Sequence, residues 1–507
     1  MDETGIVGAS PTCRVTVGMA EPTGQEVLDA AREAASTTRV AAVGSTGVTE
    51  LEPLILATRD GETAFHAGAD ASTAREVAAE LDDGDLPTEG ALAVVEHDPG
   101  TDRLPVPPET PLAVGRRRVL AGAGWVAPAS VDDFERATAD GETVRERADG
   151  LDGRGRGDAS ADRPVGEEWA TAREAAGDPV VVVNGNEADS AAGMDHTLLA
   201  SLPLVVLDGA LAVARAVGAA DVVVYLGEDD VLARGRVTAA RDALVAEGEF
   251  EVDIEVVGGP ADYRAGEPTM ALEAMEGADR IEARRRPPGP ATYGLYGRPT
   301  VVHTPRTVAQ VHAALRDDDL DADAADPGTR LVTVAGDVTA PATVELPTDA
   351  ALSRALDAVS FEGMRFACVG GQFGGLTRDL DVPASAPALR GADLGTNGVV
   401  EVFGGGACAV ATAGHRAAFA RRENCGRCVP CREGSGQLTD LLREVYDGEY
   451  AAGKLRELTR VMRESSLCAF GRDAARTVAT AMDEFEAEFV AHANGRCPTG
   501  ACEEVDG

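Results

Sequence analysis

The chain has 507 residues, which is more than one domain holds, because a single hydrophobic core stops growing at about 250–300 residues. Its 86 acidic and 46 basic residues give a formal net charge of −40, which argues against nucleic acid or an anionic membrane surface as a partner. Hydrophobic residues make up 44% of the chain, too many for a disordered protein. We therefore expect several folded domains.

Composition also bears on the compartment. Lys454 is the only lysine, so nearly all positive charge is arginine. Genomic base composition and a cytoplasm of very high salt, where screening makes an acidic surface tolerable, together explain this balance. No apolar run approaches 18 residues, and no signal-peptide pattern opens the chain. Nine cysteines, four of them in ligand spacing, fit a reducing compartment. We expect a cytoplasmic protein that reaches a membrane complex only peripherally, through partners.

The N-terminal part is predicted to be a small α/β domain at about 10–105. Apolar periodicity predicts three strands, two helices and an acidic hairpin there. The strands are expected at 13–17, 40–43 and 54–57, the hairpin at 59–67, and the helices at 24–35 and 72–81.

A charged, glycine-rich segment follows at 126–165 and is predicted to be a linker with a glycine-rich loop. It contains Gly153, Arg154 and Gly155 between two further glycines. Glycine clusters let backbone N–H groups approach a phosphate, but a flexible loop explains the pattern equally well.

Residues 166–327 alternate between strands and helices, which predicts a parallel sheet covered by helices. The elements are expected at 179–183, 210–217, 221–226, 236–246 and 251–257. Ligands of such sheets bind at the carboxyl ends of the strands. Those ends carry Asn184-Gly-Asn186-Glu187 and the stretch 258–267.

The remaining chain is predicted as a small β-rich domain at 328–410, a helical segment at 420–495 and a tail at 496–507. The β-rich domain combines a hairpin at 331–346 with a helix at 350–359. The helical segment shows apolar residues at helical spacing over 433–446, 455–462 and 472–493.

Four cysteines carry the strongest chemical signal. Cys425, Cys428 and Cys431 have two-residue gaps, and Cys468 follows thirty-seven positions after the last of them. A short turn can point three sulfurs at one centre while a distant loop supplies the fourth, which is the pattern of a 4Fe-4S cluster. A zinc site is the alternative, although zinc ligands more often come as separated pairs or with histidine. The turn should lie at a helix N-terminus, where partial positive charge favours thiolates.

The motifs Glu423-Asn-Cys-Gly-Arg-Cys-Val-Pro-Cys-Arg-Glu-Gly434 and Ser466-Leu-Cys-Ala-Phe-Gly471, in this chain order, resemble the NADH-oxidising flavoprotein subunit of respiratory complex I and its relatives in NAD-linked hydrogenases and formate dehydrogenases. The resemblance implies an α/β multidomain fold: a thioredoxin-like head, a Rossmann-like FMN-type domain, a ubiquitin-like β-grasp domain and a C-terminal helical bundle that carries the cluster. Only Cys13 stands where the related head domain has four cluster cysteines, so we expect a degenerate head without a cluster.

The resemblance also implies a flavin site. Gly153, Arg154 and Gly155 match the start of the family's phosphate loop, Asn184 and Glu187 match the next motif, and Tyr263, Gly266 and Glu267 match the third. Several positions depart from the family pattern, among them Asn186, which stands where an aspartate is usual. Glu168 replaces a lysine, Pro268 replaces an acidic residue, and His303-Thr304 replaces a pair of asparagines. A wrong charge at a polar site weakens binding steeply.

The cluster motif is complete, whereas the flavin site departs from the family pattern. Two functions are compatible with this difference. In the first, the protein is an NADH dehydrogenase-like oxidoreductase, in which FMN takes electrons from NAD(P)H and the cluster passes them on to other redox subunits. In the second, it is a cluster-only relay or assembly subunit without NADH activity. The remaining thiols are expected to be unligated: Cys368 and Cys408 in packing, and Cys497 and Cys502 free or shared with a partner chain.

Overall fold

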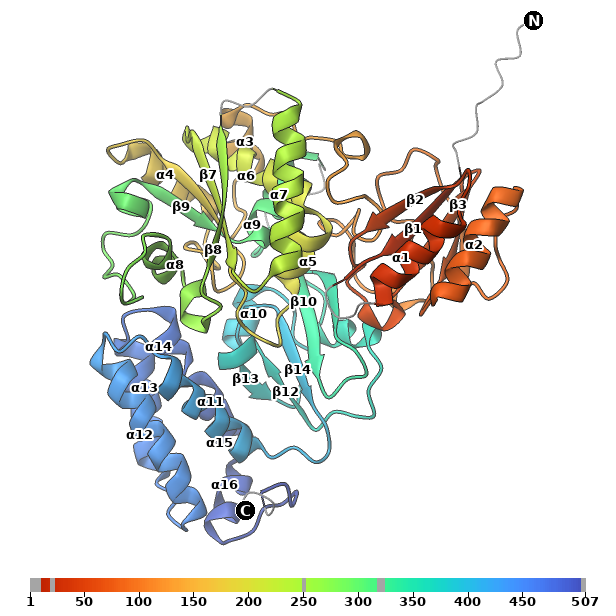
Figure 1. Ribbon diagram of the computed structural model, residues 1–507. Helices are drawn as coiled ribbons and strands as arrows, with labels where there is room; N and C mark the ends of the chain where they lie inside the picture. The colour runs from red at the N-terminus through yellow and green to blue at the C-terminus, as the bar shows by residue number, and fades with distance from the viewer. Residues whose placement is uncertain (1–10, 19–22, 249–251, 317–323, 503–507) are drawn as a thin grey trace, which may run out of the picture.

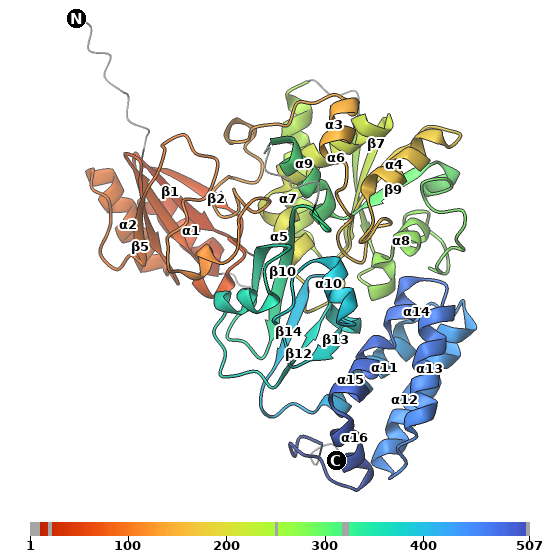
Figure 2. The same cartoon turned by 180° about the vertical axis from the view of Figure 1, so that it is seen from behind.

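The computed structural model describes residues 11–18, 23–248, 252–316 and 324–502. The start of the strand expected at 251–257 and the last five residues of the predicted tail lie outside the described residues. The described chain forms a mixed α/β molecule with three separate sheets and a C-terminal group of helices (Figure 1). The N-terminal sheet and the helical group lie at opposite ends of the molecule in both views (Figures 1 and 2).

The N-terminal sheet has five strands in the order β2-β1-β3-β4-β5. Only the β1–β2 pair is parallel. Helices α1 and α2 pack on each other and on the sheet, and Cys13 lies fully buried in the resulting core. The elements are β1 (Thr12–Thr16), α1 (Thr23–Ala34), β2 (Arg39–Val43), β3 (Ile55–Arg59), β4 (Glu62–His66), α2 (Ala71–Asp83) and β5 (Ala93–Glu96), in good agreement with the expected pattern.

The second sheet is fully parallel, with the strand order β8-β7-β6-β9. Every residue of β6 is buried, as expected for a central strand covered on both faces. Helix α6 is buried over most of its length and packs against α7 and α9. The elements are α3 (Gly141–Arg147), α4 (Val165–Glu174), β6 (Val180–Gly185), α5 (Met194–Ser201), α6 (Pro203–Val217), β7 (Asp221–Gly227), α7 (Val231–Ala246), β8 (Asp253–Gly259), α8 (Pro268–Met275), β9 (Thr300–His303) and α9 (Pro305–Arg316).

The glycine-rich segment before α4 is packed into the molecule. Leu151, Arg154 and Asp158 are all nearly inaccessible to solvent. Arg154 forms an ion pair with Asp326, at 2.7 Å between Nη1 and Oδ1, and donates from Nη2 to the carbonyl oxygen of Pro327. Composition alone was compatible with a flexible loop here. These buried polar contacts instead hold the segment between the second and third sheets.

The third sheet has the order β11-β10-β14-β12-β13. Its strands are β10 (Thr329–Gly336), β11 (Ala342–Pro347), β12 (Phe366–Val369), β13 (Gly375–Thr377) and β14 (Val399–Phe403), and α10 (Ala386–Gly391) precedes β14. The helix expected at 350–359 is a 3₁₀ helix over Leu352–Ala358.

The helical group contains α11 (Ala409–Glu423), α12 (Val429–Tyr446), α13 (Ala452–Ser465), α14 (Ala469–Asp473), α15 (Arg476–Glu484) and α16 (Glu486–Ala493). The single helix expected at 472–493 is therefore broken, and the prediction was wrong there. Phe485, between α15 and α16, has a non-helical backbone (φ −128°, ψ 25°). Its buried ring packs edge-on against Phe366 of the third sheet, so tertiary packing overrides the helical pattern.

Among the described residues, no single helix has both the length and the apolar character needed to cross a membrane. The pair α5 and α6 reaches that length together, with a bend of 99° between them.

Candidate functional site

The four cysteines of the sequence motif line one small pocket. Cys425, Cys428, Cys431 and Cys468 surround it together with Met270, Ala283, Leu467 and Phe470. The motif residues therefore converge although Cys468 lies far from the others in the sequence.

Helix ends place three of these thiols. Cys428 is the N-cap residue of α12, Cys431 lies in the first turn of that helix, and Cys468 is the N-cap residue of α14. The free N–H groups and the dipole of each helix favour negative charge at these positions. Gly426, with φ +79°, turns the chain between Cys425 and Cys428, and its N–H donates to Oδ1 of Asn424.

Gly471 lets the two cysteine segments approach each other. A Cβ atom at this position would lie 2.6 Å from Oγ of Ser466 and 2.8 Å from Cβ of Cys431. Only glycine fits so close to the neighbouring chain, which explains the Gly at the end of the second motif.

Burial disfavours free thiolates in the pocket, and a bound cation would stabilise them. Burial raises the pKa of Cys468 to about 12, with Glu267 adding to the effect. Burial, followed by the neighbouring Cys428 and Cys468, raises the pKa of Cys431 still further. Metal ions supply the positive charge that holds such thiols deprotonated.

A much larger cavity of about 630 Å³ adjoins the cysteine pocket. Its walls come from the glycine-rich segment, the end of the second sheet, the third sheet and the loop before α14. Leu467 and Cys468 line both cavities. A ligand in the large cavity and a cluster in the cysteine pocket would thus be separated by one loop.

The large cavity is rich in positive charge, although the chain as a whole is strongly acidic. Seven arginines line it against four carboxylates: Arg156, Arg163, Arg284, Arg286, Arg390, Arg472 and Arg476, with Asp158, Asp162, Glu267 and Asp473. Several of these are paired, for example Arg476 with Asp473 and Arg390 with Asp162. The surplus of cations suits an anionic ligand such as a phosphate ester.

Arg156 is the most notable of these arginines. Its guanidinium carbon lies 3.9 Å from the centre of the Tyr263 ring, and its backbone N–H donates to Oδ1 of Asn397. Its Nη1 atom is buried and has no hydrogen-bond partner within the described part of the chain. A buried donor without a partner marks a place where a ligand acceptor would be stabilised.

Three of the eight predicted flavin-site residues line the cavity: Gly155, Tyr263 and Glu267. Gly155 has φ +82°, which favours glycine. Glu267 caps α8 with Oε2, which accepts from the N–H groups of Thr269 and Met270. Its Oε1 lies 3.6 Å from Nη2 of Arg286.

The other five predicted residues lie behind this surface and hold it in shape. Asn184 donates from Nδ2 to the carbonyl oxygens of Gly157 (3.0 Å) and Gly266 (3.1 Å), and so joins the glycine-rich segment to the turn after β8. A Cβ atom on Gly266 would lie 2.5 Å from the carbonyl oxygen of Asn186. Gly153 is crowded in the same way by Asp158 and Ser160.

Arg154 and Glu187 are also buried away from the cavity. Arg154 makes the ion pair with Asp326 described above. Glu187 accepts from the N–H groups of Asp195 and His196 at the start of α5. Burial, and then the neighbouring Asp195, raises the pKa of Glu187 to about 7.

His303, one of the departures from the family pattern, belongs to a buried hydrogen-bond network, and Glu168, another departure, lies close enough to His303 to feel its charge. Trp169 donates from Nε1 to Nε2 of His303 (2.8 Å), which leaves the proton of His303 on Nδ1, 3.1 Å from both carboxylate oxygens of Asp158. Burial alone would raise the pKa of Asp158, but His303 and the surrounding hydroxyl groups lower it. Burial raises the pKa of Glu168, and its Oε1 is buried without a hydrogen-bond partner among the described residues.

Sequence reasoning missed most of the arginines, because they reach the cavity on long side chains from four separate parts of the chain. The triple arginine at 284–286 and the glycines around 370 were visible signals. Gly370 and Gly395 face each other so closely that a Cβ on Gly370 would lie 2.3 Å from Cα of Gly395. Both glycines line the cavity.

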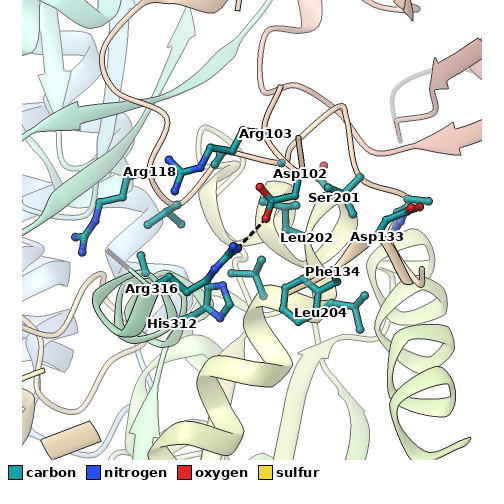
Figure 3. Close-up of a pocket in the computed structure, with 18 residues that line it drawn as sticks. Asp102, Arg103, Arg118, Asp133, Phe134, Ser201, Leu202, Leu204, His312 and Arg316 are labelled. Carbon is teal, nitrogen blue, oxygen red and sulfur yellow. Dashed lines mark hydrogen bonds and ion pairs between the residues drawn. The ribbon is translucent and has the colours of Figure 1, made fainter. Parts of the chain in front are cut away.

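A further pocket of about 50 Å³ lies between the N-terminal region and α9 (Figure 3). Arg316 donates from Nη1 to Oδ2 of Asp102 across it, at 2.9 Å, and His312 and Phe134 lie beside that pair. None of the predicted site residues lines this pocket, and it is too small for a nucleotide.

Two family models match the segments that build these cavities. Residues 149–313 match the Nuo51 FMN-binding domain, and residues 411–492 match the iron-sulfur binding region of NADH-ubiquinone oxidoreductase-F. The loop Gly153-Arg154-Gly155 thus falls inside the first match, and all four motif cysteines fall inside the second.

Curated relatives agree with the family models. The second F-type subunit of the NADH-quinone oxidoreductase of Rhizobium meliloti is 31% identical over 68% of this chain and 87% of its own length. The F-type subunit of the Mycobacterium bovis enzyme is 31% identical over 69% of this chain and 84% of its own length. HndC, from the NADP-reducing hydrogenase of Solidesulfovibrio fructosivorans, is 29% identical over 70% of this chain and 76% of its own length.

Solved structures extend the likeness over nearly the whole chain. An NAD⁺-reducing [NiFe]-hydrogenase in the air-oxidised state aligns with a TM-score of 0.66 and 25% identity, covering 96% of this chain and 85% of the other. The same kind of enzyme in the H₂-reduced state gives a TM-score of 0.66 and 24% identity, covering 96% and 84%. The fold, the cysteine pocket and these matches together show that the chain belongs to the family of F-type subunits of NADH-quinone oxidoreductase, NADH dehydrogenase-like oxidoreductases that transfer electrons through an FMN-binding domain and a 4Fe-4S-binding region.

Proposed function

We propose that the protein takes electrons from NAD(P)H at FMN in the large cavity and passes them to a 4Fe-4S cluster on Cys425, Cys428, Cys431 and Cys468. The observation that carries this proposal is the shared wall: Leu467 and Cys468 line both cavities. When bound, FMN supplies the conversion of a two-electron hydride transfer into single-electron steps. The chain positions donor and acceptor on either side of one loop.

The cavity fits such a group by volume and by charge. We propose that Arg156 binds the phosphate, because it combines a buried unpartnered Nη1 with a position against Tyr263. Gly155 leaves room for the backbone to approach the ligand, and Glu267 holds Arg286 at the rim. We assign the other predicted flavin-site residues to support of this surface: Gly153, Arg154, Asn184, Glu187 and Gly266.

An aromatic cluster lies where the two cavities meet. Tyr263 and Phe373 line the large cavity, and Phe470 lines the cysteine pocket. The Tyr263 ring packs edge-on against Phe373 and Phe470, with centroids 5.3 and 5.9 Å apart. A dry apolar layer lowers the local dielectric and limits side reactions of a reduced cofactor with solvent.

A second candidate function is the cluster-only relay without dinucleotide chemistry. Glu168 favours it, because this carboxylate replaces the cation that the family resemblance implies beside a phosphate. In this version the cavity arginines would pair with chain carboxylates and with an anion other than a flavin nucleotide.

Cofactor analysis of anaerobically purified full-length protein separates the two functions. We expect one FMN and four iron atoms per chain, with bleaching of both flavin and cluster absorption after addition of NADH or NADPH. A Cys468→Ser variant should keep the flavin bleaching and lose the cluster absorption. Four iron atoms without flavin, and without any bleaching by either dinucleotide, would establish the relay function instead.

Finer assignments accompany this proposal. The relatives are named as subunits, which supports assembly with other redox subunits, including peripheral attachment to a membrane complex, and we place this assembly in the cytoplasm. We assign the parts as a degenerate thioredoxin-like domain without a cluster (10–105), a linker and glycine-rich loop (126–165), a Rossmann-like FMN/NADH-type domain (166–327), a ubiquitin-like β-grasp domain (328–410), a helical iron-sulfur domain (420–495) and a C-terminal tail (496–507).

A further inference from the structure

A second group of metal-binding side chains lies outside the cysteine pocket. Cys408, His492, Cys497 and Cys502 converge so that their ligand atoms all lie within 4.8 Å of one another. Cys408 precedes α11, His492 lies in the last turn of α16, and the other two follow in the C-terminal segment. Sequence alone predicts a packing role for Cys408 and a separate pair at Cys497 and Cys502. In the folded chain these three cysteines and His492 lie together.

The geometry matches one tetrahedral ion. With Zn–S of about 2.3 Å and Zn–N of about 2.0–2.1 Å, the ligand atoms of a tetrahedral zinc site lie about 3.5–3.8 Å apart. Sγ of Cys408 and Nε2 of His492 are 3.4 Å apart, and both side chains are only 3% exposed. Three cysteines and one histidine form a common ligand set of structural zinc sites.

Neighbouring groups orient the ligands as a second coordination shell does. Nδ1 of His492 lies 2.7 Å from the carbonyl oxygen of Glu488, so it carries the proton and Nε2 is free to bind a metal ion. The N–H of Ala411, in the first turn of α11, donates to Sγ of Cys408 at 3.4 Å, which favours a thiolate there.

The C-terminal cysteines lie on a turn of metal-binding type. Cys497 and Cys502 are separated by Pro-Thr-Gly-Ala, a spacing within the range seen for paired zinc ligands. Gly500, with φ +74°, reverses the chain between them. Arg365 also ties the two sides of the site together, because it donates to the carbonyl oxygen of Ala407 and to Oε1 of Glu488.

We propose that Cys408, His492, Cys497 and Cys502 bind one zinc ion that fastens the C-terminal segment to the start of α11. The site is separate from the cysteine pocket: α11 has 15 residues and is therefore about 22 Å long, with Cys408 at one end and Cys425 beyond the other. It does not depend on the function of the large cavity.

Metal analysis of the full-length protein tests this directly. Anaerobically purified protein should contain one zinc per chain in addition to the iron of the cysteine pocket. A C497S/C502S double variant should lose the zinc and keep the iron, whereas Cys468→Ser should lose the iron and keep the zinc. Cys13→Ser, at a buried thiol in the N-terminal core, is the matched control and should keep both metals.

A spectroscopic experiment covers the case in which the double variant does not fold. Wild-type protein stripped of zinc by a chelator should take up one Co²⁺ per chain and show the ligand-field bands of tetrahedral thiolate coordination, which zinc then displaces. Unchanged zinc content in C497S/C502S, iron in place of zinc, a Cys497–Cys502 disulfide in the anaerobic protein, or failure to bind Co²⁺ would each overturn the proposal.

Discussion

The cysteine pocket and the large cavity lie side by side but are built in opposite ways. The four predicted ligands of the pocket come from two segments and all line it, and Met270 and Ala283 complete its wall. The cavity is formed by long arginine side chains from many segments, and only three of the eight residues predicted for it reach its surface. Two short motifs are enough to identify the residues of the pocket, whereas a large anion site depends on how many distant segments fold together.

The largest effect is expected at the pocket. Cys431→Ser should remove the cluster and destabilise the α12–α14 region, because cluster binding contributes to folding there. Iron analysis and circular dichroism of the variant measure both effects. Full iron content in the variant would contradict the ligand assignment, and Cys368→Ser, at another buried thiol, serves as the control.

Gly471→Ala tests the close approach of the two cysteine segments. The added methyl group would lie under 3 Å from Ser466 and Cys431. We expect a loss of about 1–3 kcal/mol in the free energy of unfolding and a lower iron content. Gly436→Ala, at a position inside α12 with open space around it, is the control and should keep the iron content and lose no stability, because alanine favours a helix more than glycine does. Equal stability of the two variants would show that the segments can separate at little cost.

Arg156→Ala tests the cavity. Losing a charge-assisted hydrogen bond should weaken FMN binding about tenfold or more, equivalent to about 1.5–3 kcal/mol. Flavin titration of the stripped protein measures this. Arg354→Ala removes an exposed arginine outside the cavity and should leave the affinity unchanged. An unchanged affinity in Arg156→Ala would move the phosphate site to another of the cavity arginines.

Glu168→Gln should give the smallest effect and depends on pH. Burial raises the pKa of Glu168 in the folded protein above that in the unfolded chain. The folded protein therefore holds this proton over a pH range where the unfolded chain has lost it, so stability falls as pH rises through that range. Glutamine is neutral at every pH and avoids the cost of burying a charged carboxylate. We therefore expect the free energy of unfolding to rise by about 1 kcal/mol at pH 8 and by less at pH 5. Urea unfolding at both pH values measures it; a gain that is independent of pH would exclude ionisation as its cause.

Local periodicity predicted the elements well where packing agrees with it, as in the β1–α1–β2 segment and in α12. It failed at Phe485, because a contact with Phe366, more than a hundred residues earlier, decides the backbone there. The same dependence on distant contacts explains why the second metal-binding group could not be predicted from the sequence. Cys408 and His492 are 84 residues apart, and only the folding of α11 against α16 brings them together.

If Cys468 binds the cluster as proposed, its position in the wall of both cavities makes the cluster a sensor of the neighbouring cavity. A molecule that fills the cavity would contact the loop that holds Cys468, and would so alter the electrostatic surroundings of one corner of the cluster. Electron paramagnetic resonance of the reduced cluster should therefore change its line shape when the cavity fills, even with a ligand that undergoes no redox reaction. Occupancy of the cavity can then be read from the iron instead of from the ligand.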